Sequence, residues 1–352
     1  MSALSGIFSG IGSVIVAVLL LGVLITLHEL GHFSAARALR LPVEEFAIGF
    51  GPAIWKRQKG DTRFSIRILP IGGFCAFYGE DQDNPDPRAY NRQPAWKRLV
   101  SIFSGPLANL LAGLLLTLFL LTVIGQSVVT ATVGSVDDGL PAQAAGMMQG
   151  DVIRAINDVQ VNGDYTVAQH AIEQNGEQAL TIIVERQGVP VSLSMTPFYD
   201  QEMQRARIGM TFASDTVRMG FGEAIGYSFS YCYNMVKEML IFFRDLFFKG
   251  QGLDGITGPV GTVATISRYV PDGIATVLSL AVLISINLAL VNLLPLPALD
   301  GARMIFVLIE IIFRKPVPRE KEAWVHAGGL VLLLGLIVLV TVRDIIRMFG
   351  GA

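Results

Sequence analysis

Four long uncharged runs of hydrophobic residues are expected to cross a membrane. Burying an unpaired charge in hydrocarbon is costly, so uncharged runs locate membrane spans directly. The runs are residues 11–27, 107–124, 273–299 and 327–342. About 20 apolar residues cross roughly 30 Å of hydrocarbon. The fourth run is shorter, and we expect it to extend through residues 343–349, with those charges reaching the membrane surface.

Lys and Arg are concentrated in two of the three connections between these runs. Residues 40–98 carry ten of them, and the short stretch 301–326 carries five. The positive-inside rule places both connections in the cytoplasm. The long connection 137–272, with sixteen acidic and nine basic residues, and both termini are then expected outside. No basic residue precedes the first run, so it lacks the start of a cleavable signal and is expected to stay in the mature protein.

The long connection holds a domain with short strand-like runs and regular turn signals. Residues 181–184 and 191–195 alternate with Asn-Gly and Gln-Gly pairs, which is typical of antiparallel strands. Residues 221–249 change to helical spacing, with apolar and charged side chains on opposite faces. Such a helix can belong to the core of the insert, but its aromatic content favours a position along the membrane surface.

The expected organisation therefore has four parts. They are an N-terminal membrane core (1–126), a β-rich domain (127–213), an interfacial helix with a linker (214–270), and a C-terminal membrane core (271–352).

The first hydrophobic run ends in the motif His28-Glu29-Leu30-Gly31-His32. Residues four apart share a helix face, so His28 and His32 can bind one ion, with Glu29 beside it. Catalytic zinc needs a third protein ligand and an open position. The three residues can also simply end the span at the interface, but ionisable groups beside an apolar run are expensive and are usually functional.

Asp300 is the candidate for the third ligand. It follows the third run, where Pro295 and Pro297 break the helix. The first and third spans run in the same direction, which brings Asp300 to the membrane depth of His28. The alternative is an Asp-Gly turn at the cytoplasmic boundary. Zinc activates water, and Glu29 can move its proton to the leaving amine, so the motif predicts peptide-bond hydrolysis without a covalent intermediate.

Composition narrows the class further. The 352 residues are 52% hydrophobic and 16% charged, against about 25% charged in soluble domains. The mean hydropathy is +0.53 and the formal charge is −2, which excludes a disordered chain and a nucleic-acid-binding protein. Cys75 and Cys232 are too few and too far apart for a disulfide framework. His170 and His326 are expected to be ordinary surface or interfacial histidines.

These motifs together resemble the site-2 protease family of intramembrane zinc metalloproteases, most closely its bacterial RseP/RasP-like branch. The resemblance covers nearly the whole chain, through the motifs at residues 28–32, 49–52, 71–74, 104–109 and 292–301. It implies that zinc is held by His28, His32 and Asp300, with Glu29 as the catalytic base. It also implies that Asn109 and Asn292 lie near the cleft, where they hold substrate or support the transition state.

Two further segments take a meaning from the resemblance. Residues 139–146, 150–157 and 207–210 resemble a single PDZ domain of the permuted bacterial type, whose groove takes a peptide as an added strand. In the family this domain restrains access until a substrate has lost its bulky outer part. Residues 63–74 form either an ordinary cytoplasmic hairpin or a membrane-dipping β-loop, whose edge near Gly72 and Gly73 pairs with unwound substrate.

We therefore expect an α-helical polytopic membrane protein with four transmembrane helices, a membrane-associated β-loop and an inserted β-rich PDZ domain. The predicted function is a zinc endopeptidase of the bacterial cytoplasmic (inner) membrane that cuts single-pass membrane proteins in regulated intramembrane proteolysis. Releasing an anti-sigma factor and clearing signal-peptide remnants are examples. The alternative is a PDZ scaffold or chaperone with a structural zinc, which would not need Glu29. A transporter would require inverted repeats, and the halves of this sequence are not self-similar. The partners expected are the bilayer, a membrane substrate and a peptide ligand, without nucleic acid.

Overall fold

The computed structural model describes residues 2–80, 84–201, 203–252 and 255–349 of the chain. The chain forms two compact units. One consists of Met1–Thr122 together with Gly220–Ala352, and the other of Val123–Met219. We call them the membrane unit and the β-rich domain.

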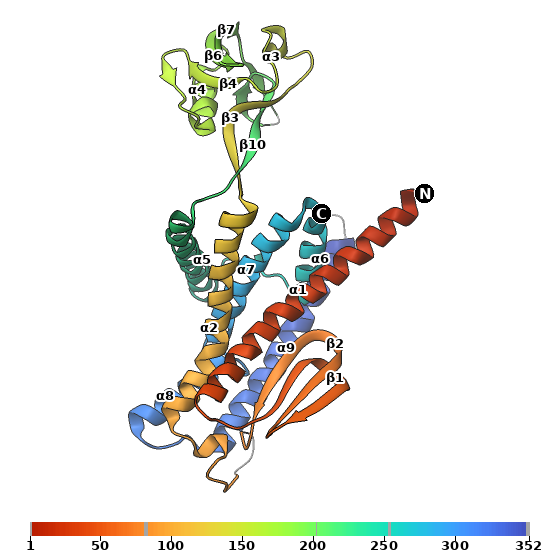
Figure 1. The fold of residues 1–352 in the computed structure, drawn as a ribbon, viewed down its shortest axis with the longest axis vertical. Helices are drawn as coiled ribbons and strands as arrows, with labels where there is room; N and C mark the ends of the chain where they lie inside the picture. Colours follow the sequence, from red (N-terminus) through yellow and green to blue (C-terminus); the bar gives the residue numbers. More distant parts are fainter. Residues whose placement is uncertain (1, 81–83, 202, 253–254, 350–352) are drawn as a thin grey trace. The chain divides into compact units, whose positions relative to one another are not determined.

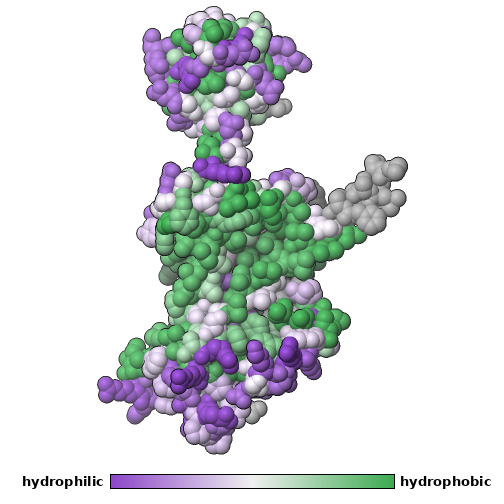
Figure 2. Space-filling model, viewed as in Figure 1, coloured by the Kyte–Doolittle hydropathy of each residue, from purple (hydrophilic) through white to green (hydrophobic). Residues whose placement is uncertain are grey.

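Four helices of the membrane unit are long and apolar enough to cross a bilayer. They cover Gly10–Ala38, Ala95–Ile124, Ile274–Leu293 and Glu320–Arg347. A broad hydrophobic band covers this unit between polar ends (Figure 2). The four predicted spans are thereby confirmed. In Figure 1 they are α1 (Ser2–Ala38), α2 (Ala95–Phe119, continued by a π-helical turn at Leu120–Ile124), α7 (Ile274–Leu293) and α9 (Arg319–Phe349).

Small residues let α2 approach its two neighbours closely. A Cβ atom on Gly31 of α1 would overlap the carbonyl of Ser104, and a Cβ atom on Gly113 would lie 2.9 Å from the Ile286 side chain of α7. Ser285 of α7 also donates a hydrogen bond to the backbone carbonyl of Asn109 (2.8 Å). Packing of this kind holds helices together in lipid, where apolar contact alone gives little preference for another helix.

A hairpin follows α1, made of β1 (Val43–Lys59) and β2 (Thr62–Phe77). Both strands bend, so their segments pair in the order 53–59, 62–67, 43–48 and 73–77. Residues 73–77 therefore form an edge of this small sheet. Figure 1 shows the hairpin beside α1.

Glu45 anchors the centre of the hairpin. Its buried carboxylate accepts hydrogen bonds from Ser65 (2.6 Å), from Arg67 (2.7 Å) and from Arg63. Burial alone would raise the pKa of Glu45, but these hydrogen bonds outweigh it and lower the pKa to about 2. These hydrogen bonds and ion pairs of Glu45 therefore stabilise the hairpin.

The helix predicted at residues 221–249 is α5 (Phe221–Lys249). It belongs to the membrane unit, where its apolar side packs against α2 and α7. The contacts come from five of its side chains, which are Cys232, Met235, Val236, Met239 and Phe243. Four shorter helical segments complete the described part of the unit, namely α6 (Pro259–Tyr269), α8 (Asp300–Phe313) and 3-10 turns at Tyr90–Arg92 and Val270–Asp272.

The β-rich domain is built on an antiparallel sheet in the order β10-β3-β4-β6-β7, with β5 paired to β4 and a separate β8-β9 pair. Helix α4 begins at an Asp164 cap whose carboxylate accepts from the Thr166 N–H. The core is apolar, with Ile153, Ile182 and Val184 fully buried. The predicted β-rich insert is confirmed. Its elements are β3 (Gln126–Val136), α3 (Pro141–Ala144), β4 (Val152–Ile156), β5 (Val159–Gln160), α4 (Tyr165–Asn175), β6 (Leu180–Arg186), β7 (Val189–Met195), β8 (Phe198–Asp200), β9 (Arg205–Arg207) and β10 (Met210–Val217).

Candidate metal centre

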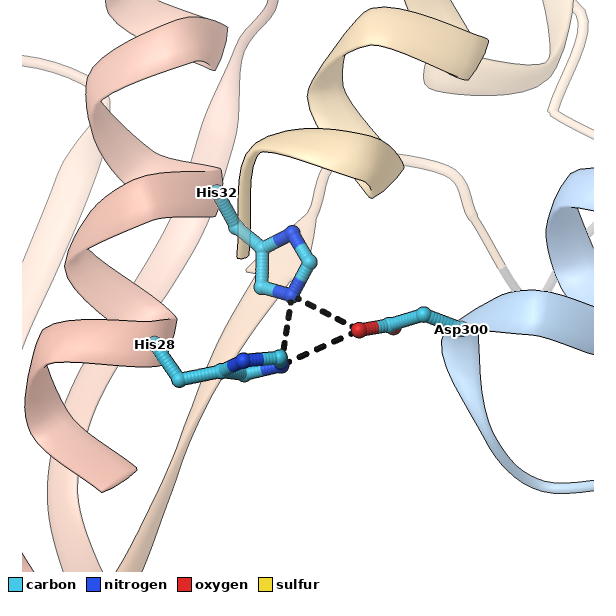
Figure 3. A group of neighbouring side chains, drawn as sticks. All are labelled: His28, His32 and Asp300. Atoms are coloured by element: carbon cyan, nitrogen blue, oxygen red, sulfur yellow. Dashed lines mark hydrogen bonds and ion pairs between the residues drawn. The ribbon is translucent and has the colours of Figure 1, made fainter. Parts of the chain in front are cut away.

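Two histidines of α1 and one aspartate of α8 converge inside the membrane unit (Figure 3). His28 and His32 lie one helical turn apart and are 5% and 7% exposed. The Asp300 Oδ2 atom lies 3.0 Å from Nε2 of His28 and 3.3 Å from Nε2 of His32. The two Nε2 atoms are 3.2 Å apart. The structure therefore brings together all three predicted ligands, although 268 positions separate His32 from Asp300 (300 − 32).

The chain after α7 explains how Asp300 reaches the histidines. α7 ends at Leu293, and Pro295 and Pro297 prevent the helix from continuing. Asp300 is the first residue of α8, so it opens a new helix. A Cβ atom on Gly301 would overlap the carbonyls of Leu293 and Leu294, which explains why glycine follows the aspartate.

The spacing of the three atoms fits zinc. Zinc–nitrogen distances of about 2.0–2.1 Å in a tetrahedral arrangement place ligand atoms about 3.3 Å apart. The hydrogen bonding of His32 fits as well. Its Nδ1 must carry the proton because it donates to the Ser101 carbonyl (2.8 Å). In the neutral ring, Nε2 then presents a lone pair to the Asp300 oxygen, and a cation between these two acceptors would stabilise the pair.

A cavity of about 510 Å³ opens on the three ligands. Glu29, Gly72, Gly73 and Asn292 all line it, so these predicted residues share one space with the metal ligands. Its volume is typical of a ligand-binding pocket. The side chain of Glu29 is partly buried within it.

The edge of the hairpin sheet forms one wall of this cavity. Residues 72–77 all line it, and a backbone hydrogen bond from Cys75 reaches the Glu29 carboxylate. A Cβ atom on Gly73 would lie 2.8 Å from the Ala47 carbonyl and 3.4 Å from Cγ of Glu29. Gly72 has φ = +92°, and a side chain there would overlap the Phe50 ring. Glycine is thus required where the strand passes the motif at residues 28–32.

Asn109 takes a different position from the other predicted residues. It is fully buried on α2, and the residues lining the cavity do not include it. Its amide nitrogen lies 3.4 Å from Nδ1 of His28, and its amide oxygen has no hydrogen-bond partner. Asn109 therefore lies behind the predicted ligand His28, away from the cavity.

Three residues that contribute to the site lie outside the motifs from which the site was predicted. The Ser101 carbonyl binds His32, and no pattern could reveal a backbone acceptor 69 positions away. Arg303 and Glu80 form an ion pair (2.5 Å) in the cavity wall. Arg303 is three residues after Asp300, so helical spacing could have placed it on the same face.

Comparisons with known proteins identify the family of this chain. Residues 16–336 match the family described as Peptidase family M50. The chain is 28% identical to the regulator of sigma-W protease RasP of Bacillus subtilis, over 96% of this chain and 99% of that protein. It is 29% identical to the zinc metalloprotease RasP of Geobacillus kaustophilus, over 96% of this chain and 98% of that protein.

Among solved structures, a PDZ domain of an SdrC-like protein from Listeria monocytogenes is 20% identical, with a TM-score of 0.21. The match covers 23% of this chain and 85% of that domain.

The family match confirms the predicted class. The protein is a zinc-dependent metalloprotease with membrane-spanning helices, of the type that acts on membrane proteins in regulated intramembrane proteolysis. The alternative of a PDZ scaffold with a structural zinc is not favoured. The predicted location in the inner membrane is supported as well. The chain belongs to Peptidase family M50, the site-2 protease family.

Proposed function

We propose that His28, His32 and Asp300 hold the catalytic zinc ion and that Glu29 is the general base. The observation that carries the proposal is the convergence of three ligand atoms, 3.0–3.3 Å apart, on a cavity that Glu29 also lines. The two histidines are buried and Asp300 is partly buried. A structural zinc site fills its fourth position with protein, whereas here the cavity leaves room for water and substrate.

The chemistry divides between the ion and the chain. When bound, zinc polarises the scissile carbonyl and acidifies water. Glu29 takes the proton from the attacking water and delivers it to the leaving amine, as general acid–base catalysis requires. Its position beside the Cys75 backbone holds the carboxylate at the edge strand, where a scissile bond would lie.

Asn109 is proposed to orient His28. The two orientations of its amide have opposite consequences for zinc. If the NH₂ group faces His28, it donates to Nδ1 and places the imidazole proton on Nε2, where it blocks a metal. If the oxygen faces His28, it accepts from Nδ1–H and leaves Nε2 free to bind. Metal-bound histidines usually donate their other N–H in this way.

The substrate is proposed to be a single-pass membrane protein that pairs with the edge strand of β2. A transmembrane helix hides its amides in internal hydrogen bonds and must be extended before hydrolysis. An exposed edge stabilises an extended segment through backbone hydrogen bonds. Gly72 and Gly73 allow close approach, and Asn292, which also lines the cavity, offers an amide that can bind the extended chain.

The distribution of basic residues supports a cytoplasmic position for the hairpin and α8 and an extracytoplasmic one for the β-rich domain and both termini. The β-rich domain is proposed to bind a peptide and to limit access until the substrate has been shortened. Cleavage would then release a cytoplasmic fragment, such as a transcription regulator bound by an anti-sigma factor, or clear a signal-peptide remnant.

The test is the variant Glu29→Gln in the full chain. We expect hydrolysis of a model single-pass substrate in proteoliposomes to fall by about 10²–10⁴-fold, because the proton acceptor is lost while the ligands remain. Zinc content should be unchanged by elemental analysis. The matched control is Glu44→Gln, an exposed glutamate of β1 outside the cavity. Near-normal cleavage by a zinc-loaded Glu29→Gln protein would overturn the assignment.

A further inference from the structure

The loop between α7 and α8 carries Asp300 and has few internal supports. Pro295 and Pro297 have no N–H group to donate. The N–H groups of Leu294, Leu296 and Leu299 bond to carbonyls within residues 291–296. The remaining N–H group of residues 294–299, that of Ala298, donates to Nδ1 of His326 on α9 (3.1 Å). One side chain of the fourth span therefore completes the hydrogen bonding of the loop that carries a metal ligand.

Ala298 is also the strained point of this loop. Its φ of +72° lies in the left-handed region that residues with a Cβ atom rarely adopt. Such a conformation persists when surrounding contacts hold it. Asp300 lies two residues further on, so relaxation of Ala298 would displace its carboxylate from His28 and His32.

His326 is placed to provide that support. Its ring packs edge-on against Phe306 of α8, with centroids 5.5 Å apart. Because an amide N–H can only donate, Nδ1 must present its lone pair to Ala298, and the ring proton resides on Nε2. That nitrogen faces Glu322, one turn earlier on α9, at 3.9 Å. Among the described residues Nε2 has no hydrogen-bond partner, so the ring is held by the Ala298 N–H and by its packing against Phe306.

A second contact lies on the same face of α9. Gly329, three residues after His326, packs against Pro297 so closely that a Cβ atom would overlap the proline ring. His326 and Gly329, three residues apart on α9, thus contact the consecutive loop residues Ala298 and Pro297. α9 is the least buried of the four spans, with 11% of its apolar window buried against 39% for α7.

We propose that His326, with Gly329, is a positioning residue that holds the Ala298 turn and so sets the reach of Asp300 toward His28 and His32. The proposal rests on the proposed role of Asp300 as a zinc ligand. It assigns a function to the fourth span, which contributes neither a ligand nor a cavity wall among the described residues.

The test compares His326→Leu with His326→Asn in the purified full-length protein. Leucine removes the acceptor, whereas the Asn oxygen occupies nearly the position of Nδ1. We expect His326→Leu to weaken zinc affinity about tenfold, measured by competition with a chromogenic chelator. kcat should fall with KM nearly unchanged. His326→Asn should restore both quantities to within about threefold, because a supporting contact acts through geometry and not through ring chemistry.

Three controls keep the outcome decisive. His170→Leu, at an exposed histidine of α4, should change nothing. Gly329→Ala should lower zinc affinity independently of any effect of leucine on folding. If leucine and asparagine variants lose zinc equally, or if neither the leucine nor the glycine variant changes affinity, the positioning role is overturned. Asp300→Asn separates the two proposals: retention of zinc there would remove the ligand assignment itself, whereas loss of zinc with a normal His326→Leu protein would remove only this inference.

Discussion

The membrane unit and the β-rich domain differ in how many polar side chains they bury. The β-rich domain buries Ile, Leu, Val and Met, and among its described residues Asp151 is the one charged or polar side chain that is buried. The membrane unit buries His28, His32, Asn109 and Ser285 together with apolar residues, while many of its Leu and Val side chains, among them Leu19, Val23 and Leu115, are exposed. The difference follows from the solvent around each unit. Water drives apolar groups inward, whereas hydrocarbon gives apolar groups no such preference.

The contrast explains where the chemistry lies. A buried polar group needs a partner, and the β-rich domain satisfies Asp151 with Arg186 at 2.7 Å and with the Met148 N–H at 2.9 Å. In the membrane unit, three polar side chains instead direct ligand atoms at one point beside a cavity, and the amide oxygen of Asn109 has no hydrogen-bond partner among the described residues. These three side chains are the ones proposed to hold the zinc ion.

The largest effect on zinc affinity is expected from loss of the buried contact between Asn109 and the proposed ligand His28. Asn109→Leu removes the contact of the Asn109 amide with Nδ1 of His28 (3.4 Å), and zinc affinity should fall by about 10–100-fold. Asn109→Asp is the matched variant, because a carboxylate can accept from Nδ1–H. It should keep affinity within about threefold. Equal zinc loss in both variants would argue against an orienting role.

A smaller effect is expected from the close packing of α1 and α2. A Cβ atom on Gly105 would overlap the His32 imidazole, so Gly105→Ala should displace a ligand. We expect a loss of about 1–3 kcal/mol in the free energy of unfolding, measured in detergent, and reduced zinc content. The comparison is Gly12→Ala on α1, which has open space around it. If both variants behave alike, close packing is not what shapes the site.

The smallest effect on catalysis is expected in the β-rich domain. Arg186→Met removes the hydrogen bonds to Asp151, which should destabilise β4 and β6 by roughly 1.5 kcal/mol in hydrogen exchange of the full chain. Zinc content should not change.

The Arg186 contact also predicts a pH dependence. The Arg186 guanidinium holds the pKa of Asp151 below its ordinary value. Its stabilisation is therefore present above the unfolded-state pKa of about 3.9 and is lost as pH falls below it toward the folded-state pKa. Arg186→Met should remove this acid sensitivity, and an unchanged acid profile in the variant would contradict it.

Much of the fold and of the metal centre could be predicted from local patterns. Uncharged runs located four spans because hydrocarbon excludes unpaired charge, and the spacing of His28 and His32 placed both on one helix face. Asp300 could be predicted as the third ligand because two prolines end α7 and because the positive-inside rule sets its depth in the membrane. Such inferences need only periodicity and the chemistry of single residue types.

Short-range patterns were enough to predict the membrane class, the number of spans and the three ligand candidates. Tertiary structure alone decided that Asn109 lies behind His28, that the Ser101 carbonyl fixes the His32 tautomer, and that His326 supports the Ala298 turn. These contacts join residues 28 to 81 positions apart through orientation and close approach. No residue type or spacing encodes them until the helices have packed.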